Sequence, residues 1–276
     1  MTGLALRLAV ALLATTSLAA AEIVSIEPPA GTADLGVRWM QVRDSDRGIM
    51  LIAVARPSGA GPLPTVIVLH GTHGFAREYV ELASALAKHG VIGVAACWFS
   101  GGGGAGAGFV TPIPCDGTPA ISAAASPATQ KTLRSLVEAV RSIPGVERNS
   151  VALFGHSLGG GAALNYALDT GGIRAAVIES AGYTDEQAVR VARLEVPILI
   201  LHGAGDTSAD GGSPLQTPQK ARSFEAVLRA AGKPVEAVYY DNAGHNGIFA
   251  DPKQFEDSVR RIAAFVTLRS ARPETR

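Results

Sequence analysis

The chain has 276 residues, which is enough for one large domain and tight for two. Hydrophobic residues make up 47% and charged residues 17% of it, which excludes a disordered chain. Lys and Arg together number 24, as do Asp and Glu, so the formal net charge is zero and does not favour nucleic acid or an anionic membrane as a partner. We expect a small-molecule partner and a monomer.

The first 21 residues are typical of a secretory signal peptide. Arg7 supplies a positive charge, residues 8–18 are an almost uninterrupted small or apolar run, and three alanines fit a cleavage site after Ala21. Cleavage would leave residues 22–276 as a single-domain protein that is secreted or periplasmic. An uncleaved anchor is the alternative, but the run is short for about 30 Å of hydrocarbon. No later run is long enough to span a bilayer.

Apolar runs and helical spacing alternate along the rest of the chain. A continuous apolar run such as residues 65–69 is typical of a strand that is buried on both faces of a sheet. This alternation predicts a largely parallel central sheet that is flanked by helices, with no large cap domain. The expected strands cover residues 37–42, 49–55, 65–69, 91–96, 151–154, 175–178, 196–201 and 235–240, and the expected helices cover 77–89, 127–143, 158–168, 186–193, 218–231 and 252–266.

The motif Gly-His-Ser-Leu-Gly at 155–159 is the first candidate for chemistry. In a chain with 32 glycines a chance Gly-x-Ser-x-Gly is not rare, so its context decides. The motif joins a buried strand to a helix, and active sites on parallel sheets lie at the carboxyl ends of the strands. A tight turn there lifts the serine hydroxyl above the sheet edge, so Ser157 is the predicted nucleophile. Gly160 and Gly161 are expected to bring the helix close to the sheet. The alternative is a structural serine in a glycine turn.

A serine hydroxyl needs a general base, and the chain has six histidines. His245 follows the last expected strand, at the sheet edge where Ser157 is expected. The order Ser, Asp, His with the histidine after the final strand is that of α/β-hydrolases, so we predict His245 as the base. His156 is adjacent to the serine, but neighbouring side chains diverge at such a turn.

Asp206 is the predicted acid that orients the imidazole and stabilises its protonated form. It ends the sequence Leu-His-Gly-Ala-Gly-Asp, directly after the strand expected at 196–201. Asp210 in the same loop and Glu179 after the preceding strand are alternatives. Asp241 is close to the histidine in sequence but fits an exposed turn.

Residues 70–75, His-Gly-Thr-His-Gly-Phe, are predicted to stabilise a developing oxyanion. The expected pair of donors is the backbone amide of Leu158 with that of Thr72 or His73. A phosphate-binding loop is the competing interpretation, but no Gly-x-Gly-x-x-Gly or P-loop pattern follows this strand. No His, Cys or carboxylate cluster has metal-ligand spacing, so we expect neither a metal nor a cofactor.

The two cysteines, Cys97 and Cys115, are 18 positions apart. In a chain that leaves the reducing cytosol this spacing favours a disulfide, which would contribute about 3 kcal/mol by restricting the unfolded chain. Two small buried hydrophobic residues are the alternative.

The segment from Trp98 to Ser126 contains few large apolar residues, too few to line a tunnel for a long acyl chain. Phe75, Trp98 and Tyr183 each follow an expected buried strand and are predicted to line a shallow cleft near Ser157. The alternative is that these aromatic residues belong to the core.

From Thr65 to the last helix the chain resembles the dienelactone-hydrolase-like branch of the α/β-hydrolases. The run GHSLGGG at 155–161 and Asp-Asn-Ala-Gly-His at 241–245 are also similar to secreted bacterial cutinases and polyester hydrolases. The chain departs from true dienelactone hydrolases because Ser157 stands where their nucleophile is cysteine. It departs from cutinase-like enzymes in the region 97–126 and in lacking their C-terminal cysteine pair.

These residues together predict a serine hydrolase that cleaves carboxylic esters, with short acyl chains preferred, through an acyl-enzyme. Acyl transfer to another acceptor and peptide hydrolysis are alternatives that use the same residues. A non-catalytic binding protein of the same fold is an alternative of another class. The set of nucleophile, base, acid and oxyanion loop argues against it.

Overall fold

The computed structural model describes residues 21–59, 61–100, 110–118, 120, 123–207 and 213–270. The expected signal peptide, apart from Ala21, lies outside the described residues, as does Asp210.

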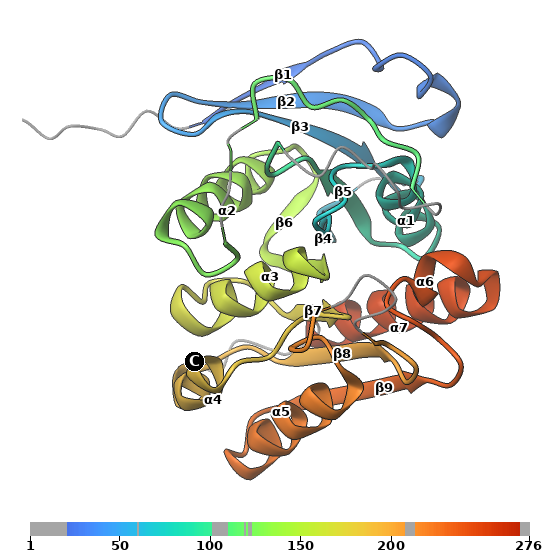
Figure 1. The fold of residues 1–276 in the computed structure, drawn as a ribbon. Helices are drawn as coiled ribbons and strands as arrows, with labels where there is room; N and C mark the ends of the chain where they lie inside the picture. Colours follow the sequence, from blue (N-terminus) through green and yellow to red (C-terminus); the bar gives the residue numbers. More distant parts are fainter. Residues whose placement is uncertain are drawn as a thin grey trace, which may run out of the picture.

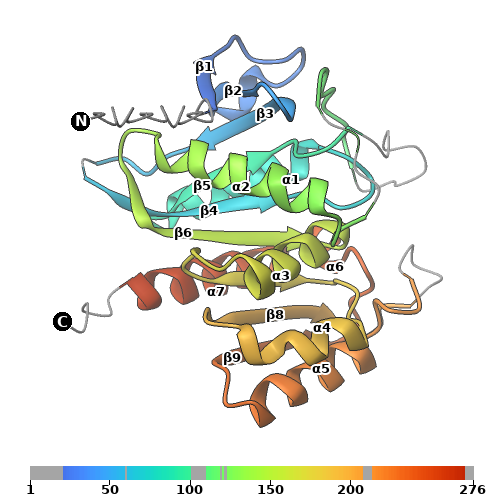
Figure 2. The same ribbon diagram turned by 90° about the vertical axis from the view of Figure 1, so that its left-hand side faces the viewer.

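Nine strands in the described residues form one sheet in the order β1-β2-β3-β5-β4-β6-β7-β8-β9. The pairs from β1 to β5 are antiparallel, and all pairs from β5 to β9 are parallel. Figure 2 shows the arrows of β4, β6 and β8 pointing the same way. The strands are β1 Glu22–Ser25, β2 Arg38–Asp44, β3 Gly48–Ala55, β4 Leu63–Leu69, β5 Ile92–Ala96, β6 Val146–His156, β7 Ala176–Glu179, β8 Ile198–Gly203 and β9 Val235–Tyr240.

Helices cover both faces of this sheet (Figure 1). One apolar core lies under α1 and α7, and the other lies under α2, α3 and α5. The expected α/β-hydrolase architecture is thus confirmed, and no large cap domain is present among the described residues. The helices are α1 Arg77–Lys88, α2 Pro127–Arg141, α3 Leu158–Asp169, α4 Asp185–Arg190, α5 Pro218–Ala230, α6 Gly247–Ala250 and α7 Pro252–Ser270, with 3-10 turns η1 at Ala33–Leu35 and η2 at Val191–Arg193.

The local signals at helix starts act as expected. Ser126 caps α2 by accepting a hydrogen bond from the Thr129 amide at 3.1 Å, and Pro127 occupies the first turn. Strand β1 and helix α6 were not predicted from the sequence. Strand β6 begins five residues earlier than expected, at Val146, which pairs with Leu63 across a register shift.

Candidate active site

The turn between β6 and α3 has the geometry that its glycines predict. Ser157 stands between them with φ 54° and ψ −116°, in the left-handed region that side chains rarely adopt. A Cβ atom at Gly155 would collide with the Gly159 carbonyl, and one at Gly159 would collide with the Leu69 carbonyl. The flanking glycines are therefore needed for close packing. Gly160 lies against Ala181 and the Gly155 carbonyl. Among the described residues, a Cβ atom at Gly161 would meet only the Ala124 Cβ in the loop before α2, so Gly161 does not bring the helix to the sheet as expected.

The three predicted side chains Ser157, His245 and Asp206 meet at the carboxyl end of the sheet. The Nε2 atom of His245 lies 3.0 Å from the Ser157 hydroxyl oxygen, and its Nδ1 atom lies 3.0 Å from Asp206 Oδ2. The serine follows β6, the aspartate follows β8 and the histidine follows β9. All three residues are buried. An imidazole held this way can accept a proton from the hydroxyl.

Asp206 accepts a hydrogen bond from a second histidine, which the sequence did not indicate. His202, on β8, lies with its Nε2 atom 3.1 Å from Asp206 Oδ2. Burial raises the pKa of Asp206, but the hydrogen bonds from His202 and His245 outweigh it, so the pKa is lowered. The carboxylate consequently remains charged.

Glu179, the alternative acid, lies apart from the His245 imidazole. Its carboxyl accepts a hydrogen bond from the Ser180 hydroxyl at 2.8 Å and lies 3.5 Å from His156 Nε2. Burial raises the pKa of Glu179 well above its usual range and lowers that of His156 well below. Burial therefore favours the neutral form of both groups over an ion pair.

The loop after β4 packs directly behind the serine. A Cβ atom at Gly71 would lie 3.1 Å from the Ser157 Cβ, and Thr72 lines the same cleft as Ser157 and Leu158. Burial lowers the pKa of His73, and the nearby charge of His245 lowers it further. The loop after β4 thus packs against the serine turn, and the role of its amides as oxyanion donors stays a prediction.

Tyr79 of α1 connects this loop to the turn that holds the serine, a role that its helical spacing alone did not reveal. Its hydroxyl accepts from the Gly71 amide at 3.1 Å and lies 2.8 Å from His156 Nδ1. Burial lowers the pKa of His70 to about 4, and its neutral ring bonds the Gly71 carbonyl at 2.9 Å through Nδ1. Buried hydrogen bonds therefore fix the loop.

A cleft of about 420 Å³ opens beside Ser157. Its walls mix small apolar residues with polar side chains from α3, α4 and the turn before α5. The lining includes Thr72, Ala124, Ser157, Leu158, Asn165, Thr184, Gln187, Arg190, Leu215 and Gln216.

The three aromatic residues that were predicted to line a cleft near Ser157 are not among the described residues that line it. Trp98 is fully buried and donates its indole N–H to the His70 carbonyl at 3.1 Å. Tyr183 is buried and stacks on Phe224 at a centroid distance of 5.1 Å. Phe75 lines a separate hollow with His73. All three side chains are buried and belong to the apolar cores on the two faces of the sheet, so the alternative that they are core residues holds.

Gln216 is the contact to the serine that the sequence did not indicate. Its Nε2 atom donates to Ser157 Oγ at 2.9 Å from the turn before α5. No sequence motif surrounds Gln216. Its contact with Ser157 depends on the path that the chain takes between β8 and α5.

A sequence model of the dienelactone hydrolase family matches residues 51–265. The chain belongs to the dienelactone hydrolase family. Membership makes it a hydrolase of the α/β-hydrolase fold, and it confirms that branch of the resemblance, whereas the likeness to cutinases stays a prediction. A search of curated proteins found no match to this chain.

Solved structures agree with this family member in fold. A putative dienelactone hydrolase from Klebsiella pneumoniae is 20% identical with a TM-score of 0.61, covering 89% of this chain and 99% of that one. An esterase from Pyrococcus furiosus is 14% identical with a TM-score of 0.65, over 88% and 97% of the two chains. A dienelactone hydrolase-like promiscuous phosphotriesterase from metagenomic libraries is 20% identical with a TM-score of 0.58, over 91% and 98%.

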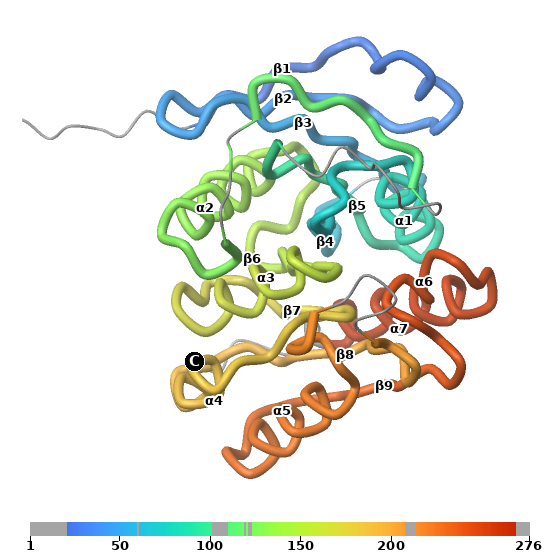
Figure 3. The backbone as a smooth tube through the Cα atoms, viewed as in Figure 1, coloured from blue at the N-terminus to red at the C-terminus, as the bar shows by residue number. Residues whose placement is uncertain are grey.

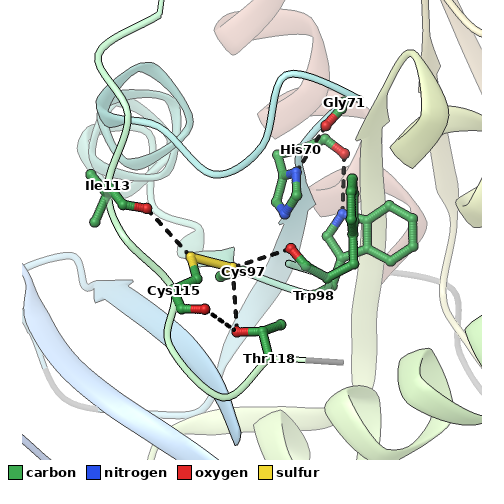
Figure 4. The surroundings of a disulfide bond; sticks show 8 residues. His70, Gly71, Cys97, Trp98, Ile113, Cys115 and Thr118 are labelled. Carbon is green, nitrogen blue, oxygen red and sulfur yellow. Dashed lines mark hydrogen bonds between the residues drawn. A yellow bond between two sulfur atoms is a disulfide. The ribbon is translucent and has the colours of Figure 1, made fainter. Parts of the chain in front are cut away.

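In this dienelactone hydrolase family member, Cys97 and Cys115 form a disulfide with Cα atoms 6.3 Å apart (Figure 4). The bond joins the end of β5 to residues 110–118. In space this segment passes from the start of α1 to the start of β3 (Figure 3). There the Ile113 amide donates to the Phe75 carbonyl at 3.0 Å. The disulfide thus fastens a segment that packs against the loop after β4.

None of the helices in the described part of the chain is both long enough and apolar enough to cross a lipid bilayer.

Proposed function

We propose that this protein is a serine hydrolase that cleaves carboxylic esters through an acyl-enzyme. The observation that carries the proposal is the continuous series of hydrogen bonds from Ser157 through His245 to Asp206. Ser157 itself lies in a strained turn beside the loop after β4. In this proposal Ser157 is the nucleophile, His245 is the base and Asp206 is the acid that orients it.

In the proposed reaction, Ser157 Oγ bonds to the ester carbonyl carbon while its proton passes to His245 Nε2. The backbone amides of Leu158 and of Thr72 or His73 stabilise the negative oxygen of the tetrahedral intermediate. The intermediate collapses, the alcohol leaves with the proton from His245, and an acyl-serine remains. Water then attacks the acyl-serine as His245 takes its proton, and the acid leaves as Ser157 is restored.

The lining of the cleft supports a preference for short acyl groups. An added methylene contributes binding energy only where it finds an apolar wall, and Asn165, Gln187 and Arg190 interrupt the apolar lining here. We therefore propose highest kcat/KM for acyl groups of about two to six carbons, with a steep loss beyond about ten. Amide turnover should be much slower.

We propose further that the chain is exported through its first 21 residues. The disulfide between Cys97 and Cys115 supports this, because such bonds persist in oxidising compartments. Mass spectrometry of the protein from the periplasm or medium should find Glu22 as the first residue, and an intact Met1 would contradict export by cleavage.

The test of the catalytic proposal is labelling with a fluorophosphonate and a panel of nitrophenyl esters of increasing acyl length. We expect the label on Ser157 alone, because it has both a base and donors for an oxyanion. Ser157→Ala should lose label and turnover, whereas Ser223→Ala, at an exposed serine of α5, should keep both.

Label at another residue, or no label on the folded protein, would favour a binding protein. A rate that rises toward long acyl chains, or efficient peptide cleavage, would contradict the substrate class.

A further inference from the structure

Gln216 contacts the reacting atom of the proposed hydrolase. Its side-chain amide donates from Nε2 to Ser157 Oγ at 2.9 Å. The serine hydroxyl thus donates to His245 and accepts from Gln216 in the same arrangement.

Two hydrogen bonds hold the glutamine in this orientation. The Ser213 amide donates to Gln216 Oε1 at 2.7 Å, so the other end of the amide, Nε2, faces the serine. The backbone carbonyl of Gln216 lies 3.4 Å from Nε2 of His202, the histidine that also bonds Asp206. The turn is therefore anchored beside both ends of the hydrogen-bonded series.

The sheet order puts Gln216 across the serine from the predicted oxyanion donors. Thr72 follows β4 and Ser157 follows β6, whereas Gln216 follows β8, with β7 between β6 and β8. Thr72 and Gln216 line the same cleft. An ester whose carbonyl oxygen turns toward Thr72 thus places another part of the molecule against Gln216.

That part is the acyl group. The leaving alcohol must lie near His245, which returns the proton to it. Of the described residues that line the cleft, none comes from the loop of His245, and that loop lines a different hollow. The cleft beside Gln216 therefore receives the other half of the ester.

We propose that Gln216 selects esters of short acids that carry an oxygen atom near the carbonyl, namely hydroxy-, alkoxy- or oxo-acids. This inference rests on the proposed esterase function. The reacting carbon approaches Ser157 Oγ to about 3 Å, so an oxygen on the next carbon of the acyl group, two bonds from the reacting carbon, comes within reach of Gln216 Nε2. Nε2 has two N–H groups, and the Ser180 carbonyl lies 3.5 Å from it. An alkyl group of equal size displaces the contact with Ser157 and leaves the N–H on that side without an acceptor, which costs affinity.

The experiment compares nitrophenyl methoxyacetate with nitrophenyl butyrate, whose acyl groups are equal in size and differ by an ether oxygen in place of a methylene. The measured quantity is the ratio of the two kcat/KM values in each variant relative to wild type, which cancels the difference in intrinsic reactivity. Gln216→Met keeps the length of the side chain and removes its N–H, so the ratio should fall about tenfold. Gln216→Asn, which moves the amide away from Ser157 by one methylene, should also lower the ratio. This second variant is used if Gln216→Met does not fold.

Gln219→Met is the matched control, because Gln219 is exposed three residues further along, on α5, and the ratio should not change. A ratio within twofold of wild type in both Gln216 variants of an active enzyme would overturn this inference alone. Absence of both ester turnover and phosphonate label in the folded wild type would instead refute the proposed function, and the inference with it.

Discussion

At Asp206 two imidazoles converge on one carboxylate oxygen. His245 approaches at 3.0 Å and His202 at 3.1 Å. Two donors offset the cost of burying the charge, so the carboxylate can orient His245 and stabilise its protonated form. A carboxamide could not replace it, because it lacks the negative charge that stabilises the protonated imidazole.

Asp206→Asn is accordingly expected to lower kcat by orders of magnitude, up to about 10⁴, while the fold persists. Ester kinetics together with circular dichroism check this. The matched control is Asp241→Asn, the same change at an exposed residue of the turn after β9, which should leave kcat close to wild type. The assignment of the acid is wrong if Asp206→Asn is mild and Glu179→Gln is far more damaging.

Glu179 leads to a prediction about the pH dependence of stability, because it is buried beside His156. Burial raises its pKa, the Ser180 hydrogen bond lowers it and the charge of Asp206 raises it, with a net rise. The folded protein therefore holds a proton that the unfolded chain releases above its usual pKa, so this group stabilises the fold most at low pH and less as the pH rises toward the raised value. Glu179→Gln should remove that dependence.

Urea unfolding between pH 5 and 8 measures the effect. The stability of Glu179→Gln relative to wild type should increase across this range, whereas Glu256→Gln, at an exposed carboxylate of α7, should show a constant difference. A constant difference for Glu179→Gln as well would mean that this carboxyl is already ionised in the folded protein.

At the scale of elements, the contact of α3 with the sheet holds the serine turn in place. The first turn of the helix lies against the end of β4, where the Leu69 and His70 carbonyls leave no room for a Cβ atom at Gly159. Those carbonyls begin the loop that carries the predicted oxyanion donors. Packing of this helix and placement of the loop are therefore coupled.

Gly159→Ala should destabilise the protein by about 1–3 kcal/mol, because backbone rather than a movable side chain must yield. It should also slow phosphonate labelling of Ser157, because the loop after β4 shifts. Thermal unfolding and labelling rates measure the two effects.

Gly161→Ala is the matched control, since the Ala124 Cβ, at 3.3 Å, is the only atom of the described residues that its Cβ would meet, and alanine favours a helix by about 1 kcal/mol. It should be close to neutral. Equal behaviour of the two variants would show that the tight contact at Gly159 does not hold the turn.

For the whole molecule, the disulfide joins parts of the chain that the sheet alone does not connect. Residues 110–118 hydrogen-bond to Phe75 and Arg77 near α1 and to Ile49 at β3. The bond to Cys97 anchors this segment at the end of β5. Its main effect on stability is to restrict the unfolded chain.

The double variant Cys97→Ala/Cys115→Ala should lose about 3 kcal/mol of unfolding free energy in urea. Reduction of the wild type should cost a similar amount, and a reductant should have no effect on the double variant. A loss well under 1 kcal/mol would mean that the hydrogen bonds of the segment already restrict the chain.

The sequence by itself determined the fold class and predicted three side chains that meet at one edge of the sheet. Apolar runs and helical spacing are local patterns, and they located the parallel strands β4 to β9 to within a few residues, apart from the early start of β6. Because parallel strands end at one edge, the positions of Ser157, Asp206 and His245 after their strands predicted that they would meet there. Their distances agree with that expectation.

The tertiary structure decided which other side chains reach that edge. Trp98 and Tyr183 follow strands as Ser157 does, yet they turn into the core, because the direction of a side chain after a strand depends on what packs against it. His202 and Gln216 reach Asp206 and Ser157 from a strand and a turn with no motif. Such contacts depend on how the chain closes in space, which local patterns do not encode.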